Sequence, residues 1–124
     1  LKPSNNDWHD GFQSGLSRSQ MAGGLLHHVF GARAQGLFEE IPSEQLPAYL
    51  SGILIGHEVQ GMLMLFSGHE SVVIIGDELL SQSYMQAFNE YGVSTHLIKV
   101  ESATLAGLTL LADSDKPKPI APRC

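Results

Sequence analysis

The sequence has little cysteine and few basic residues, and each shortage excludes a class of protein. Its single cysteine, Cys124, closes a terminal segment rich in proline and lysine, so no internal disulfide can form and a reducing compartment, the cytoplasm, is expected. Seven Lys and Arg stand against 13 Asp and Glu, which gives a formal net charge of -6. The basic residues are scattered along the chain, so a nucleic acid is not an expected partner.

Long uninterrupted apolar runs are also missing. The most hydrophobic stretch, residues 50–66, is interrupted by His57, Glu58 and Gln60, which makes a membrane span costly. A buried helix is the better interpretation, and no membrane partner is expected. The N-terminal residues are too polar for a signal peptide. Since the sequence lacks an initiator methionine, we expect a piece of a longer protein.

The first half of the sequence has helical periodicity. With 124 residues and 43% hydrophobic content, the chain is expected to form one domain around one core. Ser43 is a candidate N-cap for the most apolar helix, and Pro47 then falls in its first turn. The expected helical segment covers residues 12–66, with helices over 12–18, 22–38 and 43–65.

The second half, residues 71–112, changes period and predicts the order strand, helix, strand, helix. Residues 72–75 are continuously apolar, as in a strand covered on both faces. Asp77 can cap the next helix, and Gly92 ends it. Residues 93–100 predict a second strand, and Ser102 is a candidate cap for the last helix. This order predicts a parallel pair of strands.

Two parallel strands have free edges and bury little surface, so we expect further strands of the sheet to lie outside this sequence. Residues 113–124 contain three prolines and predict a flexible tail.

The sequence lacks the usual signatures of a metal or catalytic site. His27 and His28 are adjacent, so they point about 100° apart on a helix. His57 and Glu58 begin like a zinc-protease motif, but Gly61 stands where the second histidine is needed. Neither glycine-rich phosphate motif and no serine nucleophile elbow is present. We therefore expect no metal site and assign no catalytic residue.

Four positions are candidates for ligand binding from their residue type and place. Gly76 ends a strand, where a glycine lets the backbone turn or approach a ligand. Asp77 either caps the next helix or accepts hydrogen bonds from ribose hydroxyls. Gly52 and Gly56 cost up to about 1 kcal/mol each within a helix. They share one face, on which either another backbone or a ligand packs closely.

Glu58 is a fifth candidate, because it lies in an otherwise apolar helix. A partly buried carboxylate needs a partner, and we expect either Arg33 or a ligand hydroxyl.

Three elements of the sequence resemble one enzyme family. They are FQSGL at residues 12–16, VFGAR at 29–33 and LFEEIPSEQLPAYLSGILIGHEVQGM at 37–62, of which YLSGILIGHE is the most specific. Together they resemble the C-terminal half of bacterial 2-dehydro-3-deoxygalactonokinases, also called 2-keto-3-deoxygalactonate kinases. The resemblance covers residues 12–112.

The resemblance implies an α/β fold, part of the ribonuclease H-like C-terminal lobe of the actin-like ATPase and sugar kinase superfamily, here residues 1–112 with an N-terminal helical segment. It implies ATP and Mg²⁺ as cofactors and the 6-hydroxyl of 2-dehydro-3-deoxy-D-galactonate as acceptor. SVVIIGDELL is similar to the adenosine-binding strand, turn and helix. The candidate cofactor contacts are then Gly76, Asp77, Gly52, Gly56 and Glu58, and Arg33 is the candidate substrate contact.

The phosphate-gripping hairpins and the general base of such kinases are not found in the sequence. The chain is therefore expected to be catalytically incomplete until the N-terminal lobe of the same protein completes it. An alternative is a non-catalytic α/β nucleotide-binding module, or one that forms a homodimer through the Gly52 and Gly56 helix. A metal-dependent hydrolase is disfavoured by the missing ligand spacing.

Overall fold

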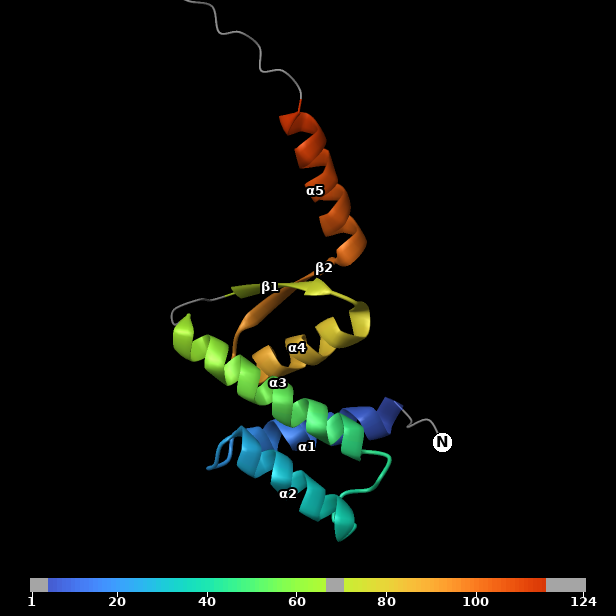
Figure 1. The fold of residues 1–124 in the computed structure, drawn as a ribbon, viewed down its shortest axis with the longest axis vertical. Helices are drawn as coiled ribbons and strands as arrows, with labels where there is room; N and C mark the ends of the chain where they lie inside the picture. The colour runs from blue at the N-terminus through green and yellow to red at the C-terminus, as the bar shows by residue number, and fades with distance from the viewer. Residues whose placement is uncertain (1–4, 67–70, 116–124) are drawn as a thin grey trace, which may run out of the picture.

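The computed structural model describes residues 5–66 and 71–115. The described chain is α/β and mostly helical, with one small parallel sheet (Figure 1). Its elements are α1 (Asn5–Ser19), α2 (Leu25–Leu37), α3 (Leu46–Leu65), β1 (Ser71–Gly76), α4 (Glu78–Glu90), β2 (Ser94–Lys99) and α5 (Val100–Ser114). None of the described helices is long and apolar enough to cross a membrane.

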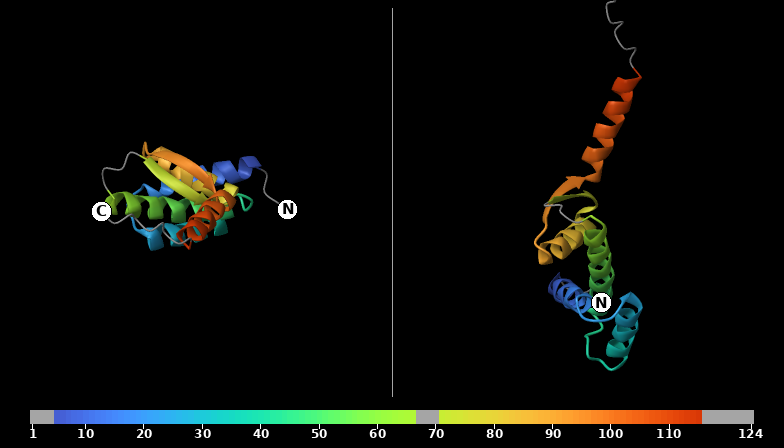
Figure 2. Two further views of the ribbon diagram at one scale, coloured as in Figure 1. Left: turned by 90° about the horizontal axis from the view of Figure 1, so that it is seen from above. Right: turned by 90° about the vertical axis from the view of Figure 1, so that its left-hand side faces the viewer.

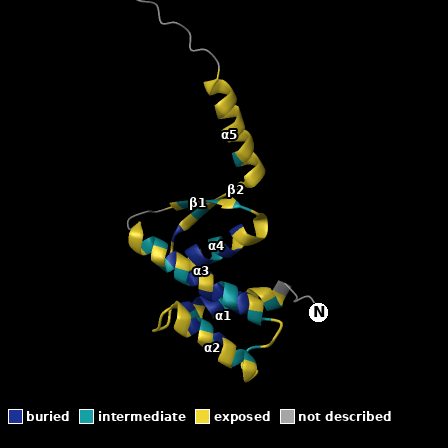
Figure 3. Ribbon diagram, in the orientation of Figure 1, coloured by how far each residue is buried: buried dark blue, intermediate teal, exposed yellow. Residues whose placement is uncertain are grey.

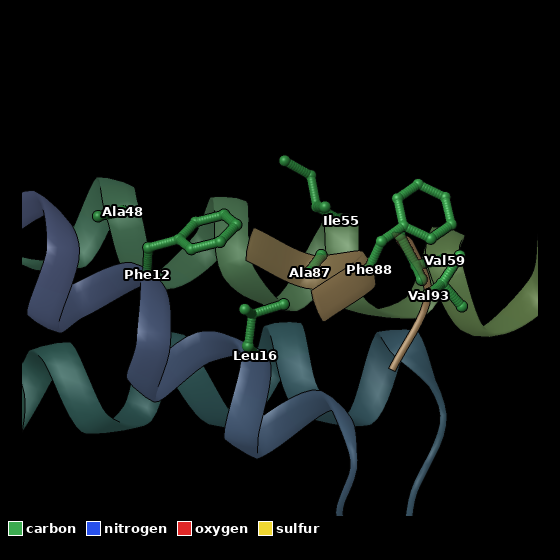
Figure 4. Close-up of a cluster of buried hydrophobic side chains, with 8 residues drawn as sticks. All are labelled: Phe12, Leu16, Ala48, Ile55, Val59, Ala87, Phe88 and Val93. Atoms are coloured by element: carbon green, nitrogen blue, oxygen red, sulfur yellow. The ribbon is translucent and has the colours of Figure 1, made fainter. Parts of the chain in front are cut away.

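Helix α3 lies at the centre and contacts α1, α2 and α4. Because helices pack on it from several sides, its apolar residues are not confined to one face. Two groups of buried side chains meet on it. One joins α3 to α1 and α4 and is shown in Figure 4, with Phe12, Leu16 and Phe88 as its largest fully buried members. The other joins α3 to Ala32 of α2.

Glycines let the backbones of α1 and α3 touch. A Cβ added to Gly52 would lie 2.9 Å from the Cα of Gly15, and one added to Gly15 would lie 3.0 Å from the Cα of Gly52. A Cβ on Gly56 would collide with Ser19 at the end of α1. Close helix packing therefore accounts for both α3 glycines, which is one of the two alternatives that the sequence left open.

Two histidines join α2 to α3. His28 is fully buried, and its Nδ1 lies 2.7 Å from Nε2 of His57 while its Nε2 lies 3.3 Å from the carbonyl oxygen of Ala22. If His28 donates from Nε2 to that carbonyl, its Nδ1 accepts a hydrogen bond from Nε2 of His57. Burial, and then the charge of His28, lower the pKa of His57.

The two strands are parallel, as predicted, with a register from Ser71 opposite Ser94 to Gly76 opposite Lys99. The prediction that the first strand is covered on both faces is wrong for the described residues. Val72 and Ile74 pack against the core, but Val73 and Ile75 remain 54% and 57% exposed. A continuous apolar run indicates that both faces of the strand are suited to burial. It does not indicate whether the residues that cover the second face belong to the same segment of the chain.

Helix α5 leaves the sheet and projects away from the other helices (Figures 1 and 2). None of its residues is buried, although it carries several leucines (Figure 3). It continues to Ser114, past its expected end at residue 112. The rest of the expected tail, residues 116–124, lies outside the described residues.

Local sequence signals correctly predicted both ends of α4, but they did not predict where α1, α3 and α5 begin. Asp77 caps α4, since its Oδ1 accepts a hydrogen bond from the Leu80 amide at 2.8 Å, and Gly92 follows α4 with φ +70°. The caps expected at Ser43 and Ser102 are wrong, because α3 begins after Gln45 and α5 begins directly after the last residue of β2. Helix α1 also begins earlier than predicted, at Asn5.

We predict that Gly52→Ala lowers the free energy of unfolding by about 1–3 kcal/mol, because the methyl group would force α1 and α3 apart. Gly61→Ala is the matched control on the same helix, since its added Cβ would meet nothing within 4 Å. That control should instead raise the free energy of unfolding by up to about 1 kcal/mol. Urea denaturation measures both, and equal effects would contradict the close packing.

We also predict that the protein loses stability as the pH falls below 6.5, the ordinary pKa of histidine. The pKa of His57 is lowered in the folded state, so the unfolded state takes up the proton first and is favoured by acid. His57→Gln keeps a donor for His28 but does not titrate, so its stability should depend less on pH in this range. His27→Gln, at the exposed neighbouring histidine, is the control. Chemical denaturation at several pH values should show the same change of unfolding free energy with pH in this variant as in the unsubstituted protein.

Candidate functional site

A cavity of about 230 Å³ lies between α3, β1 and α4. Strand β1 and one face of α4, from Leu80 to Phe88, form most of it, and the last turns of α3 close one side. Its lining is mainly apolar, with a few polar groups, and consists of Glu58, Met62, residues 72–76, Leu80, Ser81, Tyr84 and Phe88.

The corner at Gly76 sets the shape of this cavity. Strand β1 ends there, and the Asp77 cap turns the chain directly into α4. A Cβ added to Gly76 would lie 3.1 Å from Oγ of Ser81, so any larger side chain would narrow the corner. The glycine therefore keeps the backbone of the strand end accessible to a ligand.

Ser81 supplies an unsatisfied polar group. Its side chain is only 4% exposed, and its Oγ has no hydrogen-bond partner among the described residues. Buried hydroxyls are usually bonded, since leaving one unpaired costs about 1–3 kcal/mol. A ligand atom in the cavity can supply the missing partner.

Glu58 and Tyr84 form a hydrogen-bonded pair at the cavity. The Tyr84 hydroxyl donates to Oε2 of Glu58 at 2.5 Å. Burial, together with this hydrogen bond and the negative charge of Glu58, raises the pKa of Tyr84 to about 12. Tyr84 thus stays protonated at neutral pH, and the other carboxylate oxygen of Glu58 can accept a hydrogen bond from a ligand hydroxyl or amine.

The sequence-based expectation for Glu58 is wrong about its burial and about Arg33, while its other expected partner, a ligand hydroxyl, stays a prediction. Its side chain is exposed, and its partner is Tyr84 rather than Arg33. Arg33 is exposed on α2 and makes no hydrogen bond or ion pair with a described residue. Its predicted contact with substrate remains a prediction.

The structure brings two of the predicted cofactor residues together, because Gly76 and Glu58 line the same cavity. Asp77 adjoins it in the chain, and its carboxylate caps α4. Gly52 and Gly56 lie apart from it, against α1. That any of the five contacts a nucleotide stays a prediction.

Sequence reasoning missed Ser81 as a functional candidate and treated Tyr84 only as part of an apolar helix face. The signal was present, because residues 81, 84 and 88 share one face of α4. A serine on a face otherwise formed by aromatic residues is the kind of buried polar group that points to a site. Its position five residues beyond the strand end, in the first turn of α4, also places it near the corner.

The cavity can bind a ligand, but no described group in it can break a bond. Among the described residues it holds no cysteine, and its one serine, Ser81, has no adjacent base. No group of three or more His, Cys, Asp or Glu in residues 5–66 and 71–115 is placed to hold a metal ion. Its volume lies below the roughly 300 Å³ at which ligand pockets usually begin, so it fits a part of a ligand such as a flat aromatic group with a polar edge.

Comparison with known proteins gives two findings. Residues 2–111 match the sequence profile of the family described as 2-keto-3-deoxy-galactonokinase. The chain is also 30% identical over 112 residues to the 2-dehydro-3-deoxygalactonokinase of Escherichia coli strain K12. That match covers 90% of this chain but only 38% of the relative, so the chain spans well under half of the relative's length.

We predict that Glu58→Gln lowers the pKa of Tyr84 from about 12 toward the ordinary value of 10.0. The change removes the negative charge, while the burial that is the largest cause of the shift remains, so the pKa should stay above 10.0. Near-ultraviolet titration of tyrosinate measures it, and Tyr84→Phe identifies the transition. A pKa that does not respond to Glu58→Gln would contradict the pairing.

Proposed function

The chain belongs to the 2-keto-3-deoxy-galactonokinase family, and from that premise we propose that it is part of an ATP-dependent sugar-acid kinase. The resemblance identified in the sequence is thus confirmed. The proposed reaction transfers the terminal phosphoryl group of ATP to the 6-hydroxyl of 2-dehydro-3-deoxy-D-galactonate. It requires a further N-terminal lobe of the same protein, and we place it in the cytoplasm.

In this proposal the cavity at Gly76 holds the adenosine end of ATP. Ligands of open α/β sheets bind beyond the carboxyl ends of the strands, and Gly76 is such an end. The apolar side chains of Ile74 and Leu80 suit the faces of a purine. The free Oγ of Ser81 suits its polar edge, and the carboxylate of Glu58 suits a ribose hydroxyl. The orphaned Ser81 hydroxyl is the observation that carries the proposal.

The phosphate end of ATP would lie against the other lobe. The described residues of this cavity include no cation and no set of metal ligands, so they do not fit Mg²⁺. When bound, ATP supplies the phosphoryl group. The residues of this chain bind and orient the nucleoside, with Gly76 giving access to the strand end and Tyr84 fixing the carboxylate of Glu58.

The uncovered sheet supports the proposed lobe architecture. Val73, Ile75 and Leu97 expose about half of their surface on a parallel pair of strands, whereas parallel sheets are normally covered on both faces. We propose that residues 1–112 form part of a ribonuclease H-like lobe whose remaining strands and covering layer come from the rest of the protein. A dimer through the Gly52 and Gly56 helix face is disfavoured, because α1 of the same chain already occupies that face.

We predict that the chain binds adenosine weakly and that Ser81→Ala weakens this binding by about five- to tenfold, the value of one buried hydrogen bond. Ser83→Ala is the matched control. Ser83 is also buried on α4, but its Oγ donates to the carbonyl of Leu79 at 3.3 Å and does not line the cavity. The control should leave the affinity unchanged in titration calorimetry.

Gly76→Val should abolish the same binding, because the added side chain would fill the corner. The proposed nucleoside site would be contradicted if Gly76→Val still bound adenosine, or if Ser81→Ala and Ser83→Ala changed the affinity equally.

A further inference from the structure

A second cavity, of about 580 Å³, lies between α1, α2 and the start of α3. Helix α1 supplies most of its lining. The lining residues of α1 form two rows along the helix, and successive residues within a row are four positions apart, about one helical turn. One row contains Asp10, Ser14 and Arg18, and the other contains His9, Gln13 and Ser17. Its polar lining contrasts with the largely apolar walls at Gly76.

Arg18 is a cation without an anion. Its side chain is half-buried and makes no ion pair with any described residue. Nη1 donates only to the sulfur of Met21, at 3.4 Å, and the buried Nε has no hydrogen-bond partner. A buried donor normally has a partner, so the lone Nε is unusual, and the planar set of guanidinium donors matches a carboxylate.

The groups around Arg18 leave further hydrogen-bonding capacity in the cavity. The buried Tyr49 hydroxyl donates to Oε1 of Gln35 at 2.8 Å. Burial raises the pKa of Tyr49, and the nearby charge of Arg18 partly opposes that shift. The amide nitrogen of Gln35 and the hydroxyls of Ser14 and Ser17 have no side-chain partner among the described residues. These donors line the same cavity as Arg18.

Asp10 gives the opposite end a different character. It lies two turns along α1 from Arg18, and an ionised carboxylate only accepts hydrogen bonds. It therefore suits the hydroxyl groups of a ligand, and it would repel a second negative charge. The cavity thus matches a molecule with one carboxylate at one end and hydroxyls toward the other.

This cavity is separate from the corner at Gly76. Tyr49 lines the cavity at Arg18, whereas Glu58 lines the cavity at Gly76, and both residues belong to α3. Nine residues are about two and a half helical turns, so the two side chains leave α3 on opposite faces. A ligand at Arg18 therefore does not occupy the proposed nucleoside cavity.

We propose that the cavity at Arg18 binds a small hydroxylated monocarboxylate, with its carboxylate on the Arg18 guanidinium and its hydroxyls toward Ser14 and Asp10. Two kinds of ligand have this chemistry. One is the sugar acid that the proposed kinase phosphorylates, in which case the site rests on that function. The other is a different hydroxy acid that binds independently of the reaction.

The test is titration calorimetry of the chain with D-galactonate, compared with galactitol, which carries similar hydroxyls but no carboxylate. D-galactonate should bind at least about tenfold more tightly than galactitol, and Arg18→Gln should remove that difference. Lys99→Gln is the matched control, because Lys99 is an exposed cation at the end of β2 and does not line the cavity. It should change the affinity less than about twofold.

Three results would overturn the proposal: no binding of D-galactonate, equal binding of galactitol, or equal binding of inorganic phosphate. A loss caused by Arg33→Gln instead of Arg18→Gln would also overturn it and would restore the residue predicted from sequence. Circular dichroism shows that each variant is folded.

Two further arms separate this site from the proposed function. Binding of 2-dehydro-3-deoxy-D-galactonate at least about tenfold tighter than D-galactonate supports the substrate as the ligand, and equal binding supports another hydroxy acid. Ser81→Ala should leave D-galactonate binding unchanged. If the unsubstituted chain binds D-galactonate but not adenosine, only the nucleoside site is contradicted.

Discussion

The contact between the backbones of α1 and α3 is the constraint on which the rest of this structure depends. Gly15 and Gly52 bring the two helix axes so close that neither position has room for a methyl group. The contact fixes α3, and α3 in turn is the surface on which α2 and α4 pack. The glycines therefore act on both cavities indirectly, by setting where the helices that line them lie.

The central position of α3 also explains how so small a chain carries two chemically different cavities. One face meets β1 and α4, where apolar walls surround a few polar groups near Gly76. The other meets α1 and α2, where polar side chains surround Arg18. Glu58 and the unpaired cation Arg18 lie in different cavities, and Asp10 stands two turns along α1 from Arg18, so neither carboxylate pairs with it.

Sequence reasoning succeeded where a short segment contains its own signal. Asp77 and Gly92 mark the ends of α4 by local backbone chemistry, and the structure confirms both. It failed where the answer depends on what packs from elsewhere. The partner of Glu58 is 26 residues away on another helix, and the exposure of β1 depends on a layer that its own apolar run cannot reveal. Gly52 and Gly56 were recognised as one face, but only the fold shows that α1 covers it.

The distribution of charge decides what this chain can contribute to phosphoryl transfer. The transition state of such a reaction needs cations at the phosphate oxygens and a group that accepts the proton of the attacking hydroxyl. The cavity at Gly76 carries Glu58 but no cation among the described residues, and the pair with Tyr84 fixes that carboxylate in the proposed nucleoside site. The described residues therefore favour binding over the chemical step. That division is the one expected under the proposed architecture, in which the nucleotide lies between two lobes and only one wall belongs to this chain.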